Sequence, residues 1–235
     1  MNSSELRGFL TGLILGDGSI DKGVTKRSFN IKSIDYAFID YINKEIESVH
    51  TFTSFIRNIP EHYSCGCSHK ESWEYRIKAH PYFNKIYHFF YDDKRHRKIY
   101  RKTLEWLTPR GLANWYMSDG YICLVGKTKG VIRSRRIDIC TDRYYKEDVE
   151  LIVSFLKSKF NLDTSIIKRN NTYRVRIKKD SYEAFINLIY PYIIPSMYYK
   201  IYLGYDTKPK WMSNIFWDKQ QSLLSAVTLT SNVEG

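Results

Sequence analysis

The sequence has few cysteines and no long apolar run. Its four cysteines, Cys65, Cys67, Cys123 and Cys140, do not form the pattern of a secreted disulfide framework. No stretch of 18 apolar residues occurs, and the N-terminus lacks both the basic start and the uninterrupted apolar stretch of a signal peptide. We therefore expect no membrane partner and an intracellular protein in a reducing compartment, whether bacterial, phage-encoded or organellar.

Several widespread catalytic motifs are also absent. The chain has no Gly-x-Ser-x-Gly nucleophile elbow and no Gly-x-x-x-x-Gly-Lys phosphate-binding loop. The histidines His50, His80, His88 and His96 lack the partner spacing of a histidine-metal nuclease. These absences disfavour the chemistry that each of those motifs supports.

Acidic residues are fewer than basic ones. The 25 Asp and Glu residues against 37 Lys and Arg residues give a formal net charge of +12. An excess of this size favours a polyanionic partner. An anionic membrane surface is the competing partner, but no basic amphipathic helix stands out in the sequence. Nucleic acid is therefore the expected partner.

One nine-residue pattern occurs twice and organises the chain. Residues 10–18 and 112–120 are both mostly apolar and both end in Asp-Gly, at Asp17 and Asp119. The second aspartate follows the first by 102 residues, and the same offset relates Lys98-Ile99-Tyr100 to Lys200-Ile201-Tyr202. A single Asp-Gly is only a turn signal. The shared offset instead predicts two lobes related by a pseudo-twofold axis.

Each copy of the pattern predicts a helix that ends at its aspartate. Thr108 and Pro109 suit the start of the second helix, and Gly18 and Gly120 are placed to end the two helices. Glycines every four residues remove the side chains from one face of the first helix, which lets another backbone approach closely. The predicted helix interface comprises Gly8, Gly12, Gly16, Asn114 and Ser118.

The two aspartates create an electrostatic problem if the helices pack side by side. Asp17 and Asp119 would lie at the negative ends of both helix dipoles and close to each other. A divalent cation relieves both unfavourable interactions, and hard cations such as Mg²⁺ take oxygen ligands. The pattern therefore indicates a metal site between the lobes.

Hydrophobic periodicity predicts the same element order in both halves, namely a helix, a strand pair, a helix, a strand pair and a helix. The fold class is therefore α+β, with one lobe in 1–102 and the other in 103–219. We expect 220–235 to be a poorly ordered tail, because it has neither caps nor periodicity after Leu224. Besides the motif helices, we predict helices at 35–47, 81–90, 146–160 and 182–190, a polar hairpin at 19–32, and strands at 51–57, 72–78, 121–125, 131–141, 164–169 and 172–178.

Basic residues alternate with apolar residues in the predicted strands of both halves. Arg174, Arg176 and Lys178 should project from one face of a sheet whose other face enters the core. An ordinary solvated sheet face is the alternative. A twisted antiparallel sheet can follow the major groove of DNA, where Arg, Lys and Asn read bases and phosphates. The predicted DNA-binding residues are Lys26, Arg27, Asn30, Lys32, Arg76, Lys78, Arg133, Arg135, Lys168, Asn170, Arg174, Arg176 and Lys178.

A second cluster of possible metal ligands lies in the first half. His62, Cys65, Cys67 and His69 fall within eight residues and could form a zinc site. The Cys-x-Cys spacing is tighter than structural zinc sites use, and no second cysteine pair follows nearby. A hairpin loop with free thiols is therefore favoured over zinc.

The two nine-residue segments resemble the LAGLIDADG motif of homing endonucleases, in particular the single-chain members that carry both copies. The resemblance covers about residues 5–202. It implies two pseudo-symmetric αββαββα lobes with their motif helices packed at the centre. It also implies that the two antiparallel sheets form a saddle over double-stranded DNA, and that the protein is a monomer.

The resemblance also implies the site residues. The last acid of each motif, Asp17 or Asp119, would bind metal together with the preceding residue, Gly16 or Ser118. Mg²⁺ is the expected cofactor, with Mn²⁺ substituting and Ca²⁺ binding without supporting cleavage. Lys98 and Lys200 match the catalytic lysine that follows the last helix of each lobe. Four more basic residues leave open which one acts in the first lobe: Arg95, Arg97, Arg101 and Lys102.

The implied activity is site-specific DNA cleavage that serves intron homing. We expect metal-dependent phosphodiester hydrolysis on each strand and a staggered double-strand break at a long recognition site. An intron maturase that binds RNA and a cleavage-inactive DNA-binding protein are the alternatives on the same fold. The presence of Asp17, Asp119, Lys98 and Lys200 favours the nuclease over the inactive protein.

Overall fold

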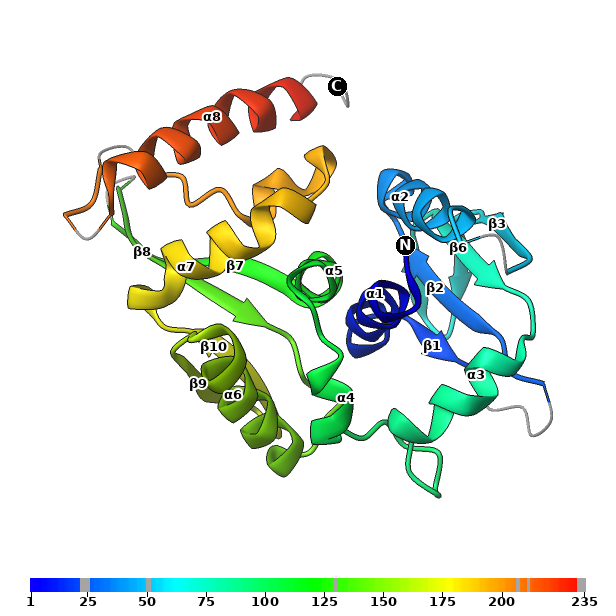
Figure 1. The fold of residues 1–235 in the computed structure, drawn as a ribbon. Helices are drawn as coiled ribbons and strands as arrows, with labels where there is room; N and C mark the ends of the chain where they lie inside the picture. Colours follow the sequence, from blue (N-terminus) through cyan, green and yellow to red (C-terminus); the bar gives the residue numbers. More distant parts are fainter. Residues whose placement is uncertain (22–25, 50–51, 129–130, 206–207, 211, 232–235) are drawn as a thin grey trace.

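Two α+β lobes lie on either side of a central pair of helices (Figure 1). The computed structural model describes residues 1–21, 26–49, 52–128, 131–205, 208–210 and 212–231, without the side chains of 124–128, 131–134 and 225–231. The two-lobed α+β architecture predicted from the repeat is confirmed. The central helices are α1 (Ser3–Leu15) and α5 (Pro109–Asp119), one from each lobe.

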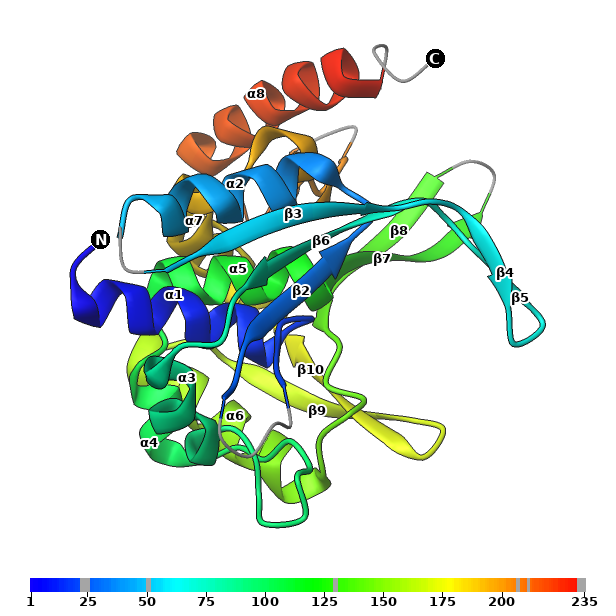
Figure 2. The ribbon, with the colours of Figure 1, turned by 90° about the vertical axis from the view of Figure 1, so that its right-hand side faces the viewer.

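The N-terminal lobe runs from α1 to the loop that ends near Tyr100. Its sheet has the strand order β1-β2-β6-β3, with all neighbours antiparallel. Figure 2 shows a long hairpin, β4 and β5, projecting from this sheet. The elements after α1 are β1 (Ser19–Ile20), β2 (Phe29–Ser33), α2 (Tyr36–Glu47), β3 (Ser54–Ile59), β4 (His62–Ser64), β5 (Cys67–His69), β6 (Ser72–Ile77), α3 (Pro81–Ile86) and the 3₁₀ helix η1 (Tyr87–Phe89).

The C-terminal lobe repeats this plan. Its sheet order is β7-β8-β10-β9, again antiparallel throughout, so the two sheets are equivalent strand for strand. The predicted division at 102/103 falls inside α4, which contacts α6 of the C-terminal lobe. The elements are α4 (Arg101–Glu105), β7 (Gly120–Thr128), β8 (Val131–Ile139), α6 (Lys146–Phe160), β9 (Thr164–Arg169), β10 (Thr172–Ile177), η2 (Lys179–Ser181), α7 (Tyr182–Ile189), η3 (Tyr190–Tyr192), η4 (Pro195–Lys200) and α8 (Asn214–Ser231).

The strands bury alternate residues, as the sequence pattern predicts. Val175 and Ile177 of β10 are fully buried, whereas Arg174 and Arg176 lie on the opposite face of the sheet. In α2, the buried residues recur at helical spacing, and the Asp35 side chain caps the helix by accepting from the backbone N–H of Phe38 at 3.2 Å. Each sheet therefore presents a polar face away from its core.

The predicted poorly ordered tail is wrong for residues 220–231, because α8 continues through Ser231. Phe216, Gln220 and Leu223 are buried along one face of this helix. The Gln220 side chain accepts from the Leu203 N–H at 2.7 Å and donates to the Ile201 carbonyl at 3.2 Å. The apolar face was missed because it begins before the proposed boundary and includes a glutamine. Residues 232–235 lie outside the described part of the chain.

The cysteine and histidine cluster lies on the β4–β5 hairpin. Cys65 and Cys67 are exposed free thiols, and Cys65 forms the hairpin turn with a positive φ of 51°. His62 and His69 face each other across the strands, with ring centroids 5.0 Å apart. Among the described residues, no group of three or more His, Cys, Asp or Glu side chains is arranged to hold a metal ion.

None of the helices in the described ranges has the combination of length and apolar character that crossing a bilayer requires.

Candidate active site

The two motif helices touch through their backbones. A methyl group on Gly12 would lie 1.8 Å from the Gly111 carbonyl oxygen, and one on Gly111 would lie 2.3 Å from the Gly8 carbonyl oxygen. Farther along, a methyl group on Gly16 would meet the Ser118 Cβ at 2.6 Å. Because side chains would force the helices apart, glycine at these positions brings the two helix ends together.

Asn114, a predicted interface residue, joins the helices by hydrogen bonds. It is fully buried, and its side chain donates weakly to the Phe9 carbonyl at 3.4 Å and accepts from the Tyr41 hydroxyl at 3.2 Å. Gly111 was missed as an interface residue. Its counterpart in the 102-residue register is Phe9, so the repeat gave no signal for it.

The two aspartates emerge at the ends of these helices. Asp119 is the last residue of α5 and is half-buried, whereas Asp17 lies just after α1 in a turn closed by the Gly18 N–H bonding to Leu13. Burial and the charge of Asp17 raise the pKa of Asp119 to about 7. The positive charges of Arg143, Arg97 and Lys200 oppose that rise without cancelling it.

This donor set fits a hard divalent cation. Two carboxylate groups from different lobes interact electrostatically here, and burial together with the charge of Asp17 disfavours the ionised form of Asp119. The sequence predicted Gly16 as a metal ligand. In the structure its carbonyl accepts hydrogen bonds from Arg97 at 2.9 Å and from Arg143 at 3.1 Å. Both lone pairs of that oxygen are thereby used. Asp17 and Asp119 are the residues present that would hold a metal.

Arg97, not Lys98, contacts the end of α1. Its guanidinium donates to the carbonyl groups of Ile14 at 2.5 Å, Gly16 at 2.9 Å and Gly18 at 2.6 Å. These bonds satisfy the carbonyls that a helix end leaves unpaired. Lys98 is exposed and lies over the Tyr100 ring, 5.6 Å from its centroid. Of the basic residues that the sequence left open in this lobe, Arg97 is the one that reaches α1. It pairs with Tyr91 in a β-bridge, so the next residue, Lys98, points away.

Lys200 takes the equivalent place at the end of α5. Its ammonium group donates to the carbonyl oxygens of Met117 and Ser118, the latter at 3.4 Å. Burial lowers the pKa of Lys200, and the nearby carboxylates of Asp119 and Asp17 oppose that shift. Its backbone is fixed in turn, since the Tyr116 hydroxyl donates to the Lys200 carbonyl at 2.7 Å. The Lys200 ammonium group thus lies close enough to Asp119 and Asp17 to interact with both electrostatically.

Two further residues reach the end of α1 from the opposite lobe. Arg143 lies 3.4 Å from the Asp17 carboxylate, and the Tyr144 hydroxyl donates to the Leu15 carbonyl at 3.0 Å. Both belong to the loop between β8 and α6. Sequence reasoning missed them because the 102-residue counterpart of Arg143 is Tyr41, in the middle of a helix.

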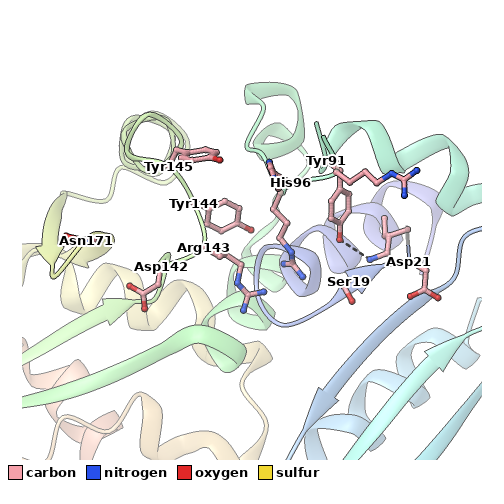
Figure 3. A pocket seen from close by; sticks show the side chains of 12 residues that line it. Ser19, Asp21, Tyr91, His96, Asp142, Arg143, Tyr144, Tyr145 and Asn171 are labelled. Atoms are coloured by element: carbon pink, nitrogen blue, oxygen red, sulfur yellow. Dashed lines mark hydrogen bonds between the residues drawn. The ribbon is translucent and has the colours of Figure 1, made fainter. Parts of the chain in front are cut away.

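Two cavities flank the helix ends. A cavity of about 700 Å³ is lined by Arg97 and Tyr91 of one lobe and by Arg143 and Tyr144 of the other. Figure 3 shows Arg143 and Tyr144 approaching it from the side opposite Tyr91. A second cavity, of about 530 Å³, is lined by Asp17, Lys32, Asp35, Ser118 and Lys200, among others. Each cavity thus combines one lobe's helix-end cation with the other lobe's strand–helix loop.

The predicted DNA-binding residues differ in their surroundings. The arginines are held by carboxylates: Arg174 pairs with Asp142, and Arg176 donates to Asp138 at 2.7 and 2.8 Å. Arg76 pairs with Glu74 at 3.3 Å. Asn30 donates to Asp21 at 2.9 Å, and Arg27 stacks on Tyr87. The exposed members are Lys26, Lys32, Lys78, Lys168, Asn170 and Lys178.

Arg135 is buried and does not belong to the predicted DNA-binding surface. It is only 4% exposed, donates to the carbonyls of Leu203 and Gly204, and stacks on Tyr205 at 4.6 Å. Its position in β8 has the parity of the buried Ile137 and Ile139, so the alternation could have assigned it to the core. The side chain of Arg133, at the same parity, lies outside the described part.

Comparison with known proteins gives consistent results. A family model described as the LAGLIDADG DNA endonuclease family matches residues 7–185. "Probable intron-encoded endonuclease 1" of Wickerhamomyces canadensis is 31% identical over 200 residues, which are 82% of this chain and 81% of that protein. "Cytochrome b mRNA maturase bI2" of Saccharomyces cerevisiae is 25% identical over 202 residues, 81% of this chain and 45% of that protein.

A solved structure is similar over most of both chains. The homing endonuclease I-WcaI, bound to its DNA recognition sequence, superposes with a TM-score of 0.72 at 27% sequence identity. The similarity covers 87% of this chain and 88% of the other.

Proposed function

The chain belongs to the LAGLIDADG DNA endonuclease family, and from that premise we propose that it is a homing endonuclease that cuts double-stranded DNA. The proposed reaction hydrolyses one phosphodiester bond in each strand and leaves a staggered break at a long target site. The observation that carries the proposal is the meeting of Asp17 and Asp119 at two helix ends surrounded by cations. Both carboxylates come from one chain, which supports action as a monomer.

Asp17 and Asp119 would hold a divalent cation. We propose Mg²⁺ for cleavage, with Mn²⁺ substituting and Ca²⁺ binding without supporting the reaction. When bound, such a cation stabilises the charge that develops on the attacking and departing oxygens. Asp119, whose pKa is raised to about 7, would bind such a cation in its deprotonated form.

Arg97 and Lys200 would each serve one scissile phosphate. A guanidinium has five N–H donors and an ammonium has three, so donors remain after the carbonyl bonds of both residues. The remaining N–H groups can bind phosphate oxygens or orient the attacking water. Ser118 and Gly16 support this arrangement through their carbonyl groups.

The polar faces of the two sheets would bind the DNA. Arg76, Arg174 and Arg176 are held in fixed orientations by carboxylates, which suits recognition of base edges. The exposed lysines, such as Lys32 and Lys178, suit contact with phosphates. The similar I-WcaI structure is of a complex with DNA, which supports assigning this surface to a DNA duplex.

RNA binding by an intron maturase is the second candidate function. The similarity to a yeast maturase favours it, and the basic surface would suit either nucleic acid. A cleavage-inactive DNA-binding protein is disfavoured, because such a protein has no use for paired carboxylates with a cation at each helix end.

The proposed function is tested by selection of cut plasmids from a library with randomised inserts, incubated in Mg²⁺, in Ca²⁺ or in EDTA. We expect one family of long sites to be cut on both strands in Mg²⁺ only, while gel shifts in Ca²⁺ show specific binding to the same sites. Specific binding without cutting at any Mg²⁺ concentration would favour the inactive DNA-binding protein. Preferential binding of structured RNA over every DNA site would favour the maturase.

A further inference from the structure

The helix that follows the second strand of each sheet has an aspartate, at its N-cap or in its first turn, that bonds into the opposite lobe. In the N-terminal lobe this residue is Asp35, the N-cap of α2. In the C-terminal lobe it is Asp148, in the first turn of α6. The two aspartates thus come from corresponding places in the two lobes, although neither belongs to the motif repeat.

Asp148 holds the segment that carries Arg97. Its Oδ1 accepts the backbone N–H of Ile99 at 3.2 Å, and both residues are buried. The N-terminal lobe holds the same segment through the Lys98 N–H, which donates to Phe90 at 3.0 Å. Ile99 lies two residues after Arg97. Without Asp148, the Ile99 N–H would be buried without a partner, and the segment would lose its fixed position against α1.

Asp35 holds the segment that carries Lys200. Its Oδ1 caps α2, and its Oδ2 accepts the Ser196 hydroxyl at 2.8 Å. Ser196 lies in η4, four residues before Lys200, so this bond fixes the turn from which the lysine projects. Asp35 and Lys200 also line the same cavity.

We propose that Asp35 and Asp148 are positioning residues that act across the lobes, each holding the segment that carries the other lobe's catalytic cation. Each half of the active site then depends on both lobes. The Arg97 half is fixed by Asp148 of the C-terminal lobe, and the Lys200 half is fixed by Asp35 of the N-terminal lobe. This inference rests on the proposed nuclease function.

If each aspartate positions one cation, its loss should affect the cleavage of one DNA strand more than that of the other. A cation displaced by about an ångström loses much of its effect on the reaction, and loss of a supporting hydrogen bond typically costs about 10- to 100-fold. Since each cation serves one scissile phosphate, removing one positioning hydrogen bond should slow cleavage of one strand and leave the cleavage rate of the other strand nearly unchanged. A general loss of stability or of DNA binding would slow both strands together.

The test measures single-turnover cleavage of an end-labelled duplex of the selected site, with each strand followed separately. Arg97→Met and Lys200→Met first identify the strand that each cation serves. Asp148→Ala should then slow the Arg97 strand about 10- to 100-fold, and Ser196→Ala should slow the Lys200 strand by a similar factor. The other strand should change less than about threefold in each case. Both variants should accumulate nicked plasmid with opposite strand bias.

Matched variants separate positioning from packing. Asp148→Asn keeps an oxygen that accepts the Ile99 N–H, so it should cleave both strands at about the wild-type rate. Tyr41→Phe removes two other bonds between the lobes, to Asn114 and from Arg110, and should show no strand bias. Arg97→Met combined with Asp148→Ala should be no slower than Arg97→Met alone, because the two residues act together.

The outcomes distinguish this inference from the proposed function. If wild-type protein cuts no strand, or if Arg97→Met and Lys200→Met slow both strands equally, the proposed division of catalysis fails. If those two variants separate the strands but Asp148→Ala and Ser196→Ala do not follow them, the positioning inference is overturned. Ser196→Ala removes one half-buried hydroxyl and leaves the α2 cap intact, so it decides the question even if Asp148→Ala does not fold.

Discussion

The two halves of the active site share a plan but use different cations. At the end of α1, the guanidinium groups of Arg97 and Arg143 bond to the carbonyl groups and to Asp17. At the end of α5, the ammonium group of Lys200 makes the corresponding bonds. A guanidinium stays charged at any pH that the protein tolerates, whereas burial lowers the pKa of Lys200. The two lobes therefore place a cation at equivalent positions, but the charges of the two cations respond differently to pH.

The carboxylates differ in the same way. Asp17 has 44% of its side chain exposed and pairs with Arg143, whereas Asp119 is half-buried and its pKa is raised to about 7. In the absence of a metal, Asp119 should therefore take up a proton near neutral pH.

Removing one of the two cations should have the largest effect on the cleavage rate. Arg97→Met and Lys200→Met should each slow cleavage of one strand by about 100- to 1000-fold, the range for removing a positioned donor to a developing negative charge. Strand-resolved single-turnover rates check this expectation. Lys102→Met is the control, because Lys102 lies over the Phe89 ring in another part of the molecule. Equal loss on both strands would show that the two halves do not act separately.

A smaller effect should appear in the stability of the metal-free protein. Asp119 has a folded pKa of about 7, above its ordinary value of 3.8, so the fold binds its proton more tightly than the unfolded chain does. The carboxyl group therefore costs nothing below pH 4 and destabilises the fold increasingly as the pH rises to 7. Asp119→Asn should raise the free energy of unfolding by roughly 2–3 kcal/mol at pH 8.

Urea unfolding at pH 4 and pH 8 in EDTA measures this difference. The advantage of Asp119→Asn should disappear at pH 4. Asp40→Asn, at an exposed pair with Lys44, should show no comparable change. An equal gain at both pH values would mean that the charge of Asp119 is not its cause.

The glycines allow a third comparison along the helix interface. A methyl group on Gly12 would lie 1.8 Å from a backbone oxygen, whereas one on Gly16 would lie 2.6 Å from the Ser118 Cβ, a less severe overlap. Gly12→Ala should therefore destabilise the protein by about 2–3 kcal/mol, and Gly16→Ala by about 1 kcal/mol. Thermal and urea unfolding measure both variants. The reverse order would mean that the helices do not approach most closely at Gly12.

The last prediction concerns how the cleavage rate of each strand depends on pH. Lys200 is positively charged only while protonated, so cleavage of its strand should fall about tenfold per pH unit once the pH exceeds its lowered pKa. The strand served by Arg97 should not fall in this way. Lys200→Arg should remove the difference between the two profiles. A rate that rises with deprotonation of Lys200 would instead make the lysine a general base.

The sequence predicted the fold through the repeat. The 102-residue offset, the alternation in β10 and the cap at Thr108 predicted the two lobes, the polar sheet faces and the start of α5. These features are local or repeated, so they can be recognised without knowledge of the tertiary structure. The helix α8 was missed because Gln220 is buried through two hydrogen bonds that only the folded chain reveals.

The candidate site was less predictable. Asp17, Asp119 and Lys200 followed from the motif, but the first cation was assigned to Lys98 because its tripeptide repeats at Lys200. The turn before it places Arg97 against α1 instead. Arg143 comes from the opposite lobe, and no sequence spacing relates it to Asp17. Contacts between lobes depend on how the lobes dock, which a linear pattern does not encode.

The most direct test of the central claim measures both strands in Asp17→Asn and Asp119→Asn. The claim is that these two residues, one from each lobe, form one shared centre that cuts both strands. In Mg²⁺, each variant should lose at least about a thousandfold in the cleavage rate of both strands, while binding to the selected site in Ca²⁺ stays within about threefold of wild type. Wild-type cutting of either strand by either variant would contradict the shared centre.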